Sequence, residues 1–300
     1  MKLTILGCHS ASPHENKNPS AQLLDTRGHR FLIDCGEGTQ VQLRKAKVSF
    51  VHIKHIFISH LHGDHFYGLP GLVSSFRLLG REAPLHIYGP KGIKEALTLL
   101  LKLASSWTNF PLHFHELDGD TSVCVFEDNE VSVYTIPLNH RVYTNGFLFA
   151  EKLGLRRINV EKATQSNVDT SQFRLLQLGQ DVNLESGAIV ENKAVTFDPA
   201  PPKKYAYCSD TAYLPSIIPL IKKVDWLYHE ATFLEQHASI ASQTKHSTAR
   251  QAASIAHEAN VGRLILGHYS SRYKDLCLFK EEACQIFKNV TLASDGLVIS

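Results

Sequence analysis

The stretch HLHGDH constrains the fold more strongly than any other part of the sequence. It follows the apolar run HIFIS (55–59), so His60, His62, Asp64 and His65 come at the end of a predicted buried strand. Burying so many polar groups is costly unless they are paired or hold a metal. In this pattern His60 and His62 can share one ion, while Asp64 and His65 face a second. Imidazole and carboxylate donors suit zinc, and less selectively manganese, cobalt or iron.

Length and composition indicate a globular enzyme. The chain has 300 residues, a net charge of +2 and 17 histidines. A charge this small excludes a strong, general electrostatic attraction to nucleic acid, so an anionic partner must be recognised locally. We expect a cytoplasmic protein with reduced cysteines, because the six cysteines form no CxxC pair, and no signal-peptide core or apolar run of membrane-spanning length occurs.

Short strands followed by helices run through both halves of the chain. The stretches 2–6, 22–26, 30–35 and 85–89 are predicted strands, and 72–80 and 247–259 are predicted helices. The stretch 89–104 is predicted to be a turn that leads into an amphipathic helix. This pattern favours two packed sheets with helices outside. Residues 151–203 are rich in Gln, Asn, Ser and Thr and weakly periodic, which indicates an insertion that contributes little to the core.

Three further candidate ligands end predicted strands. His140 ends 130–140, Asp210 ends 204–210 and His268 ends 263–268. Each alone is equally consistent with a capping or surface residue. Together with the HLHGDH residues they make seven donor groups, more than one tetrahedral ion uses, so we predict two metals bridged by Asp210. Such a pair lowers the pKa of bound water to about 7 and stabilises both oxygens of a displacement at phosphorus.

Several motifs together resemble the metallo-β-lactamase superfamily, and within it the short bacterial form of ribonuclease Z. The resemblance extends along nearly the whole chain outside 151–203, and its motifs are GEGTQ (36–40), SHLHGDHFYGLPGL (59–72), HIYGPKG (86–92), SDT (209–211), HEATF (229–233), KHSTA (245–249) and GHYSSRY (267–273). It implies an α/β fold, the four-layer αββα metallo-β-lactamase sandwich, formed by residues 1–300 as one domain with an inserted arm at 151–203.

The same resemblance implies a ligand set for each of two zinc ions per chain, with manganese or cobalt as alternatives. The first set is His60, His62 and His140; the second is Asp64, His65 and His268; Asp210 bridges them. It also implies that Asp64 accepts the proton of the nucleophilic water.

Glu230 and His246 fit the role of a general acid pair. A histidine can protonate a leaving ribose oxygen near neutral pH, and a carboxylate can hold its imidazolium. The resemblance assigns this role to the pair. Without it, His246 is equally well explained as an exposed residue preceding a helix, and His229 is expected to be a packed or surface residue.

The activity implied by the resemblance is that of a zinc-dependent endoribonuclease acting on precursor tRNA as a homodimer. It would remove the 3′ trailer, leaving a 3′-hydroxyl on the tRNA and a 5′-phosphate on the trailer. Ser270 and Arg272 follow the ligand His268 and are candidate phosphate contacts, as is Lys91.

One region departs from the family pattern. Residues 151–204 lack a Gly-Pro pair and hold eight basic against seven acidic side chains, a net charge of +1. This near-neutral balance favours the alternative of a small-molecule phosphodiesterase or sulfatase on the same dinuclear scaffold. A third hypothesis is a metal-stabilised RNA-binding protein without catalysis, which the complete ligand set and acid pair disfavour.

Overall fold

The structure is a computed structural model that describes residues 1–13 and 15–300. Its contacts divide the chain into two compact units. The first unit comprises residues 1–127, 131–150 and 203–300, and the second comprises 128–130 and 151–202. No helix among the described residues combines the length and the apolar character needed to cross a membrane.

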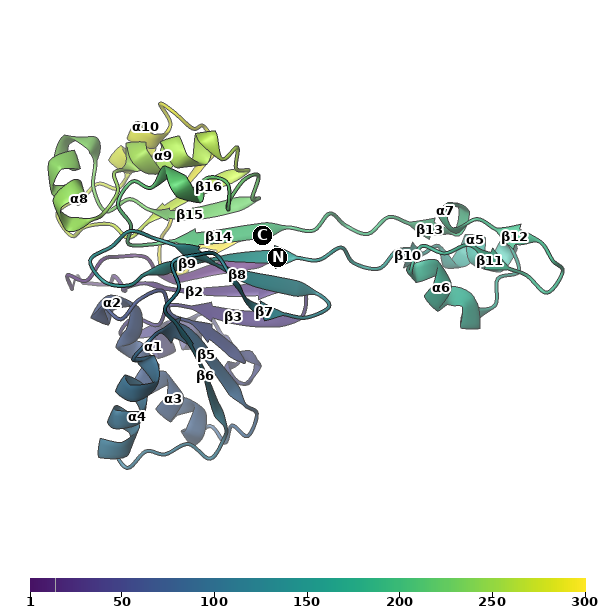
Figure 1. Ribbon diagram of the computed structural model, residues 1–300, viewed down its shortest axis with the longest axis horizontal. Coiled ribbons are helices and arrows are strands. Elements are labelled where there is room, and N and C mark those ends of the chain that lie inside the picture. The colour runs from purple at the N-terminus through teal and green to yellow at the C-terminus, as the bar shows by residue number, and fades with distance from the viewer. Residues whose placement is uncertain (14) are drawn as a thin grey trace. The chain divides into compact units, whose positions relative to one another are not determined.

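The first unit contains two seven-stranded sheets, drawn one above the other in Figure 1. In the first sheet, apolar strands lie in parallel next to an antiparallel hairpin. Its order is β18 (Val298–Ile299), β1 (Lys2–Gly7), β2 (Ala21–Thr26), β3 (His29–Ile33), β4 (His55–Phe57), β5 (Leu85–Pro90) and β6 (Leu112–Leu117).

The second sheet carries most of the remaining candidate residues at its strand ends. Its order is β17 (Val290–Leu292), β16 (Arg263–Gly267), β15 (Trp226–Glu230), β14 (Lys204–Cys208), β9 (Asn145–Glu151), β8 (Val131–Pro137) and β7 (Cys124–Glu127). The predicted strand 130–140 ends earlier, at Pro137, where proline has no N–H for further pairing. Strand β15 was not predicted, although all five of its residues are buried and it ends in Glu230.

Helices cover the outer face of each sheet (Figure 1). Those beside the first sheet are α1 (Thr39–Lys45), α2 (Gly63–Phe66), α3 (Gly68–Leu78) and α4 (Ile93–Leu103), with the 3-10 turn Phe50–His52. Those beside the second are α8 (Ala238–Thr244), α9 (Ala249–Glu258) and α10 (Cys277–Ala283), with the 3-10 turns Pro215–Ile217 and Glu235–His237.

Local sequence explains where the predicted helices begin. Helix α4 begins after Gly92, whose φ of 100° suits glycine, so the stretch 89–104 forms a turn followed by a helix, as predicted. Helix α9 begins after Thr248, which forms a capping box with Gln251. Both helices bury one apolar face against the sheets, as amphipathic helices do.

The core lies between the sheets and beneath the helices. Phe57, Phe147 and Phe149 join the two sheets through ring contacts 5.2–5.3 Å apart, and burying each such ring contributes about 1.5–3 kcal/mol. A separate cluster, including Leu72, Val73 and Leu97, fills the space between the first sheet and its helices. This layering confirms the predicted αββα sandwich.

The second unit has a small core of its own. Its five buried apolar side chains are Ala163, Val168, Leu176, Val182 and Val195. They come from short elements, which explains the weak periodicity of this stretch: β10 (Arg157–Ile158), α5 (Val160–Gln165), a 3-10 turn (Thr170–Gln172), α6 (Phe173–Gln177), β11 (Val182–Asn183), β12 (Ile189–Val190), α7 (Asn192–Val195) and β13 (Thr196–Phe197).

Candidate metal centre

Loops at the strand ends bring all seven predicted ligands together. His60 and His62 lie between β4 and α2, and Asp64 and His65 lie in α2 itself. His140 follows β8, Asp210 follows β14 and His268 follows β16. Asp210 and His268 have φ angles of 57° and 58°. A non-glycine residue in this left-handed region costs about 1–3 kcal/mol and persists where surrounding contacts impose it, as at functional sites.

The first donor set consists of His60, His62, His140 and one oxygen of Asp210. His62 Nδ1 lies 3.0 Å from His60 Nε2 and 3.4 Å from His140 Nε2. Two nitrogens bound to one tetrahedral zinc are separated by about 3.3 Å. These distances therefore match three imidazoles that share one cation.

The second donor set consists of Asp64, His65, His268 and the other oxygen of Asp210. Asp64 Oδ2 lies 3.4 Å from His65 Nε2 and 3.3 Å from His268 Nε2. The four groups are almost completely removed from water, with Asp64 the most exposed at 8% of its side chain. A cation held here would be shielded from all sides but the pocket described below.

Asp210 faces both donor sets with different oxygens. Its Oδ1 lies 3.9 Å from His60 Nε2 and 3.8 Å from His140 Nε2. Its Oδ2 lies 3.0 Å from His65 Nε2 and 3.3 Å from His268 Nε2. One carboxylate placed in this way can bind two cations at once.

Hydrogen bonds determine which ring nitrogen of the ligands carries the proton. His65 Nδ1 donates to Asp34 Oδ2 at 2.6 Å, and His140 Nδ1 donates to the carbonyl oxygen of Lys245 at 3.0 Å. His268 Nδ1 donates to Thr232 Oγ1 at 2.8 Å, because that hydroxyl already donates to Glu230. Each leaves Nε2 unprotonated toward the centre, the tautomer that a metal ligand needs.

The electrostatics of the centre favour a cation. Among the described residues, the fully buried His65 Nε2 makes no hydrogen bond of good geometry, although Asp210 Oδ2 lies 3.0 Å away. Burial lowers the pKa of His65, but Asp210, Asp64 and Asp34 outweigh it and raise that pKa well above its ordinary value. Burial likewise opposes the charge of Asp210, while His268, His65 and His60 hold its pKa well below its ordinary value. A divalent metal supplies the positive charge that these carboxylates demand, so the residues present fit such an ion.

Glu230 and His246 lie beside the donor sets. His246 Nδ1 is 2.8 Å from Glu230 Oε1 and 3.9 Å from Asp210 Oδ1. Glu230 is completely buried and also accepts from the backbone N–H groups of Thr211 and Thr232. Burial lowers the pKa of His246, but Glu230 outweighs it and raises that pKa to about 9. His246 is therefore held in its protonated form with Nε2 as the remaining donor.

The predicted substrate contacts lie in different places. Ser270 lines a pocket of about 200 Å³ together with His62, Asp64, Asp210 and His246. Arg272 is exposed, with its guanidinium 5.6 Å from the ring of Phe233, which lines the same pocket. Lys91 is exposed in the turn between β5 and α4 and does not line this pocket.

Sequence reasoning missed three residues of the site. Asp34 is buried, with a φ of 56°, and accepts hydrogen bonds from His65, Ser59 and Tyr207. Thr232 connects Glu230 to His268. Arg141 follows the ligand His140 and lines both the site pocket and a neighbouring pocket that includes the exposed Tyr67. The position of Asp34 directly after an apolar strand resembles that of Asp210 and could have marked it.

Comparisons with known proteins place this site in a family. The model of the family described as "Anti-Pycsar protein Apyc1" matches residues 1–151, which contain the HLHGDH stretch and His140. A ribonuclease Z from Porphyromonas gingivalis is 45% identical over 295 residues, covering 98% of this chain and 97% of its own. The chain belongs to the ribonuclease Z family. That alignment also spans Asp210, Glu230, His246 and His268, which lie beyond residue 151.

Solved structures support the same placement. The short form of human tRNase Z is 29% identical with a TM-score of 0.73, covering 100% of this chain and 99% of its own. The metallo-β-lactamase fold protein YhfI from Bacillus subtilis, 20% identical, has a TM-score of 0.70 over 100% of this chain and 99% of its own. Family and fold together confirm the expectation of a metal-dependent endoribonuclease, and the His and Asp clusters indicate that it binds divalent metal ions.

Proposed function

We propose that this protein removes the 3′ trailer of precursor tRNA by zinc-dependent hydrolysis of one phosphodiester bond. The products are a tRNA with a 3′-hydroxyl and a trailer with a 5′-phosphate. The observation that carries the chemistry is the position of Asp210 between two donor sets, with the His246–Glu230 pair alongside. Family membership over nearly the whole chain supports the substrate.

Two zinc ions are the proposed occupants, with manganese or cobalt as substitutes. Five imidazoles and two carboxylates form a donor set of borderline softness, and the N···N distances suit a tetrahedral ion. When bound, two such cations lower the pKa of water and stabilise charge on both the entering and the leaving oxygen. His60, His62 and His140 would hold one, Asp64, His65 and His268 the other, and Asp210 both.

The protein's own residues handle the two protons of the reaction. Asp64 is the proposed acceptor of the proton from the attacking water, since it lines the pocket and is the most exposed carboxylate of the centre. His246 is the proposed donor to the leaving 3′-oxygen. Glu230 orients His246 through Nδ1, which leaves Nε2 to transfer the proton.

Contacts to the RNA backbone are proposed around the pocket rim. Two polar side chains line the pocket: Ser270, from the loop after β16, and Arg141, from the loop after β8. Arg272 beside Phe233 offers a planar guanidinium for a phosphate. Lys91 is retained as a more distant backbone contact. The exposed ring of Tyr67 lines a neighbouring pocket together with Arg141 and offers a surface on which a base can stack.

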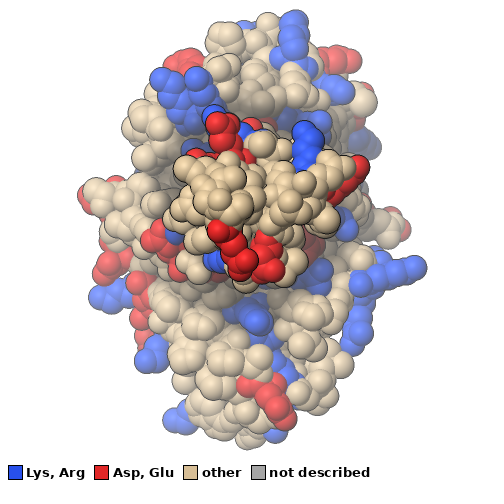
Figure 2. Space-filling model, turned by 90° about the vertical axis from the view of Figure 1, so that its right-hand side faces the viewer, with Lys and Arg blue, Asp and Glu red and all other residues tan. Residues whose placement is uncertain are grey.

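The small net charge of residues 151–204 supports a second candidate function. Figure 2 shows basic and acidic side chains interspersed over the face that it draws. With a net charge of +1 over 151–204, this segment supplies little of the counterion release that commonly drives RNA binding. The alternative is a small-molecule phosphodiesterase or sulfatase on the same centre.

A cytoplasmic homodimer is the proposed form of the enzyme. Large apolar side chains are exposed at the end of α3 (Leu78, 85%), at the end of α4 (Leu103, 74%) and in the loop after α4 (Trp107, 53%). Contiguous exposed apolar side chains are typical of protein interfaces. Light scattering should give twice the chain mass of 33.5 kDa; a single-chain mass at micromolar concentration would contradict it.

The deciding experiment compares two substrates. Wild type and His246→Ala are assayed on a precursor tRNA with a 3′ trailer and on a small activated phosphodiester, with a chelator control. We expect one cut after the discriminator base, slowed by His246→Ala about 10²–10⁴-fold, and a much smaller effect on the ester, whose leaving group needs no proton. Hydrolysis of the ester alone, with intact tRNA, would favour the alternative substrate class.

A further inference from the structure

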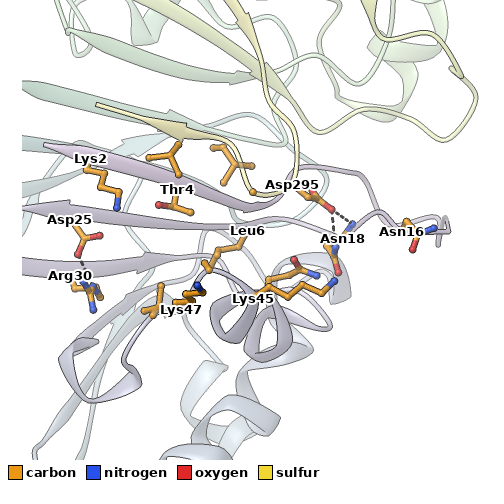
Figure 3. Close-up of a pocket in the computed structure, with 16 residues that line it drawn as sticks. Lys2, Thr4, Leu6, Asn16, Asn18, Asp25, Arg30, Lys45, Lys47 and Asp295 are labelled. Carbon is orange, nitrogen blue, oxygen red and sulfur yellow. Dashed lines mark hydrogen bonds and ion pairs between the residues drawn. The ribbon is translucent and has the colours of Figure 1, made fainter.

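Three metal-binding side chains meet outside the dinuclear centre. Cys8 and His9 follow strand β1, and Asp295 precedes β18. One ligand atom from each lies within 4.8 Å of the other two. Cys8 is completely buried, His9 is 9% exposed, and Asp295 lies in the wall of a pocket of about 450 Å³ (Figure 3).

The separation of the donors matches that of a tetrahedral metal site. Cys8 Sγ lies 3.6 Å from Asp295 Oδ1. Sulfur and oxygen bound to one zinc at about 2.3 and 2.0 Å are about 3.5 Å apart. Asp295 Oδ2 is held by the backbone and side-chain N–H groups of Asn18, as the dashed lines in Figure 3 mark. The other oxygen, Oδ1, faces the Cys8 thiol, which donates to it.

We propose that Cys8, His9 and Asp295 form a third metal site, which takes Zn²⁺ or a cation of similar softness such as Co²⁺. On binding, the Sγ–H bond breaks, an Sγ–metal bond forms and the proton leaves to solvent. Thiolate and carboxylate then neutralise the dication, and the pocket in Figure 3 supplies a path to Asp295. Thiolate, imidazole and carboxylate together are an accepted zinc donor set.

The site would stabilise the segment that presents His268. The carbonyl oxygen of Cys8 accepts from the N–H groups of His268 and Tyr269. Ser10 in turn donates to the carbonyl oxygen of Tyr269 through both N–H and Oγ. A metal joining residues 8 and 9 to residue 295 would therefore hold the backbone on which a ligand of the dinuclear centre rests. Its role is structural and does not depend on the substrate proposed above.

The competing explanation is a thiol that only donates a hydrogen bond to Asp295. Burial, reinforced by the Asp295 carboxylate, raises the pKa of Cys8 well above its ordinary value. The metal-free thiol is thus neither a nucleophile nor a reactive redox group. The two explanations differ in one measurable property, which is whether a thiolate–metal bond forms when metal is supplied.

Cobalt distinguishes this site from the dinuclear centre, because that centre has only imidazole and carboxylate donors. The full-length protein, with the exposed Cys124 and Cys277 replaced by Ser, is stripped of metal and titrated with Co²⁺. We expect three cobalt ions per chain and a near-ultraviolet thiolate-to-cobalt charge-transfer band. Cys8→Ser should remove the band and reduce the stoichiometry to two cobalt ions per chain. The matched buried variant Cys35→Ser should keep the band and the stoichiometry of three.

Asp295→Asn provides a second test that spares the thiol. The variant retains an oxygen acceptor for Asn18 but removes the carboxylate charge. The free Co²⁺ concentration needed to form half of the band should rise at least tenfold. Circular dichroism verifies that each variant is folded. Absence of the band in the protein with Cys8 intact, or its persistence in Cys8→Ser, overturns the proposal whatever the variants do to activity.

Discussion

At the scale of single residues, the candidate centre is oriented by groups outside the two donor sets. Asp34 accepts a hydrogen bond from Nδ1 of His65, and Thr232 accepts one from Nδ1 of His268. These bonds fix each ring in the tautomer and orientation that ligation requires. Mutations of such partners generally weaken metal affinity by about 10–100-fold.

Asp34→Asn should therefore weaken metal binding without removing a ligand. The amide keeps the shape of the carboxylate but lacks its charge, so His65 becomes a weaker donor. We expect a loss of metal affinity of about tenfold or more, measured by competition with a coloured chelator. Asp25→Asn, a carboxylate paired with Arg30 outside the centre, is the matched control and should bind metal normally.

Glu230→Gln should change how the reaction responds to pH. Burial opposes protonation of His246, and Glu230 reverses this and raises its pKa to about 9. An acid works only while protonated, so kcat/KM on precursor tRNA should fall as pH rises through that pKa. The cations of the centre lower the pKa, so the fall should lie below about pH 9.

Without the carboxylate charge, the alkaline fall should move to lower pH by at least about one unit. A pH–rate profile from pH 6 to 10 measures the shift, and the activated phosphodiester, which needs no acid, serves as the control substrate. An unchanged profile on RNA would show that His246 is not the acid.

At the scale of elements, a row of histidines crosses the first sheet away from the centre. His55, His86 and His113 are direct neighbours on β4, β5 and β6, and His86 Nδ1 lies 3.1 Å from His115 Nε2. The rings of His55 and His86 stack at 5.0 Å, and Phe126 from β7 packs on His55 at 4.6 Å. So many close imidazoles cannot all be charged.

This row should make the fold sensitive to acid. Burial, then His86, His29 and His115, lower the pKa of His55 from 6.5 to about 3. The folded state thus binds fewer protons than the unfolded state, so this stability is present above pH 6.5 and lost as pH falls toward 3. We expect His55→Phe, which keeps the ring stacking, to flatten the pH dependence of the unfolding free energy.

Urea denaturation at pH 5 and pH 7 measures that effect. His52→Phe, an exposed residue of the neighbouring 3-10 turn, is the control and should leave the dependence as in wild type. If the unfolding free energy changes equally between pH 5 and pH 7 in His55→Phe and in wild type, His55 is not the source of the acid sensitivity.

At the scale of the whole molecule, residues 152–203 of the second unit can be removed from the chain without removing any residue of the candidate metal centre. Strands β9 and β14 are antiparallel neighbours, with Ala150 opposite Lys204. A tight turn can therefore join Glu151 to Lys204 in place of 152–203. The main cores remain, because the buried apolar cluster of the second unit is its own.

Such a shortened chain should keep hydrolysis of the small phosphodiester within about threefold and lose at least about tenfold on precursor tRNA, equivalent to 1.4 kcal/mol of substrate binding. Kinetics on both substrates, with circular dichroism as the folding control, measure the split. Undiminished cleavage of tRNA would show that the segment has no part in substrate recognition.

The sequence by itself singled out the seven candidate ligand residues and indicated two packed sheets with helices outside. A strand ends where an apolar run stops, so a polar side chain at that point can be recognised in the sequence. His268 after RLILG (263–267) is an example. Helix starts were less exact, and β15 was missed, because its WLYHE pattern lacks the alternation of a half-buried strand. Local patterns record burial but not which residues meet.

Only the tertiary structure decided how distant residues meet. The division of the two Asp210 oxygens, the bond from His65 to Asp34 and the contact between Cys8 and Asp295, 287 positions apart, depend on loops from different strands converging at one edge. Such contacts leave no periodic trace in the chain, because each is made by single side chains whose direction is set by backbone turns. The second unit likewise acquired a core from apolar residues too sparse to show a period.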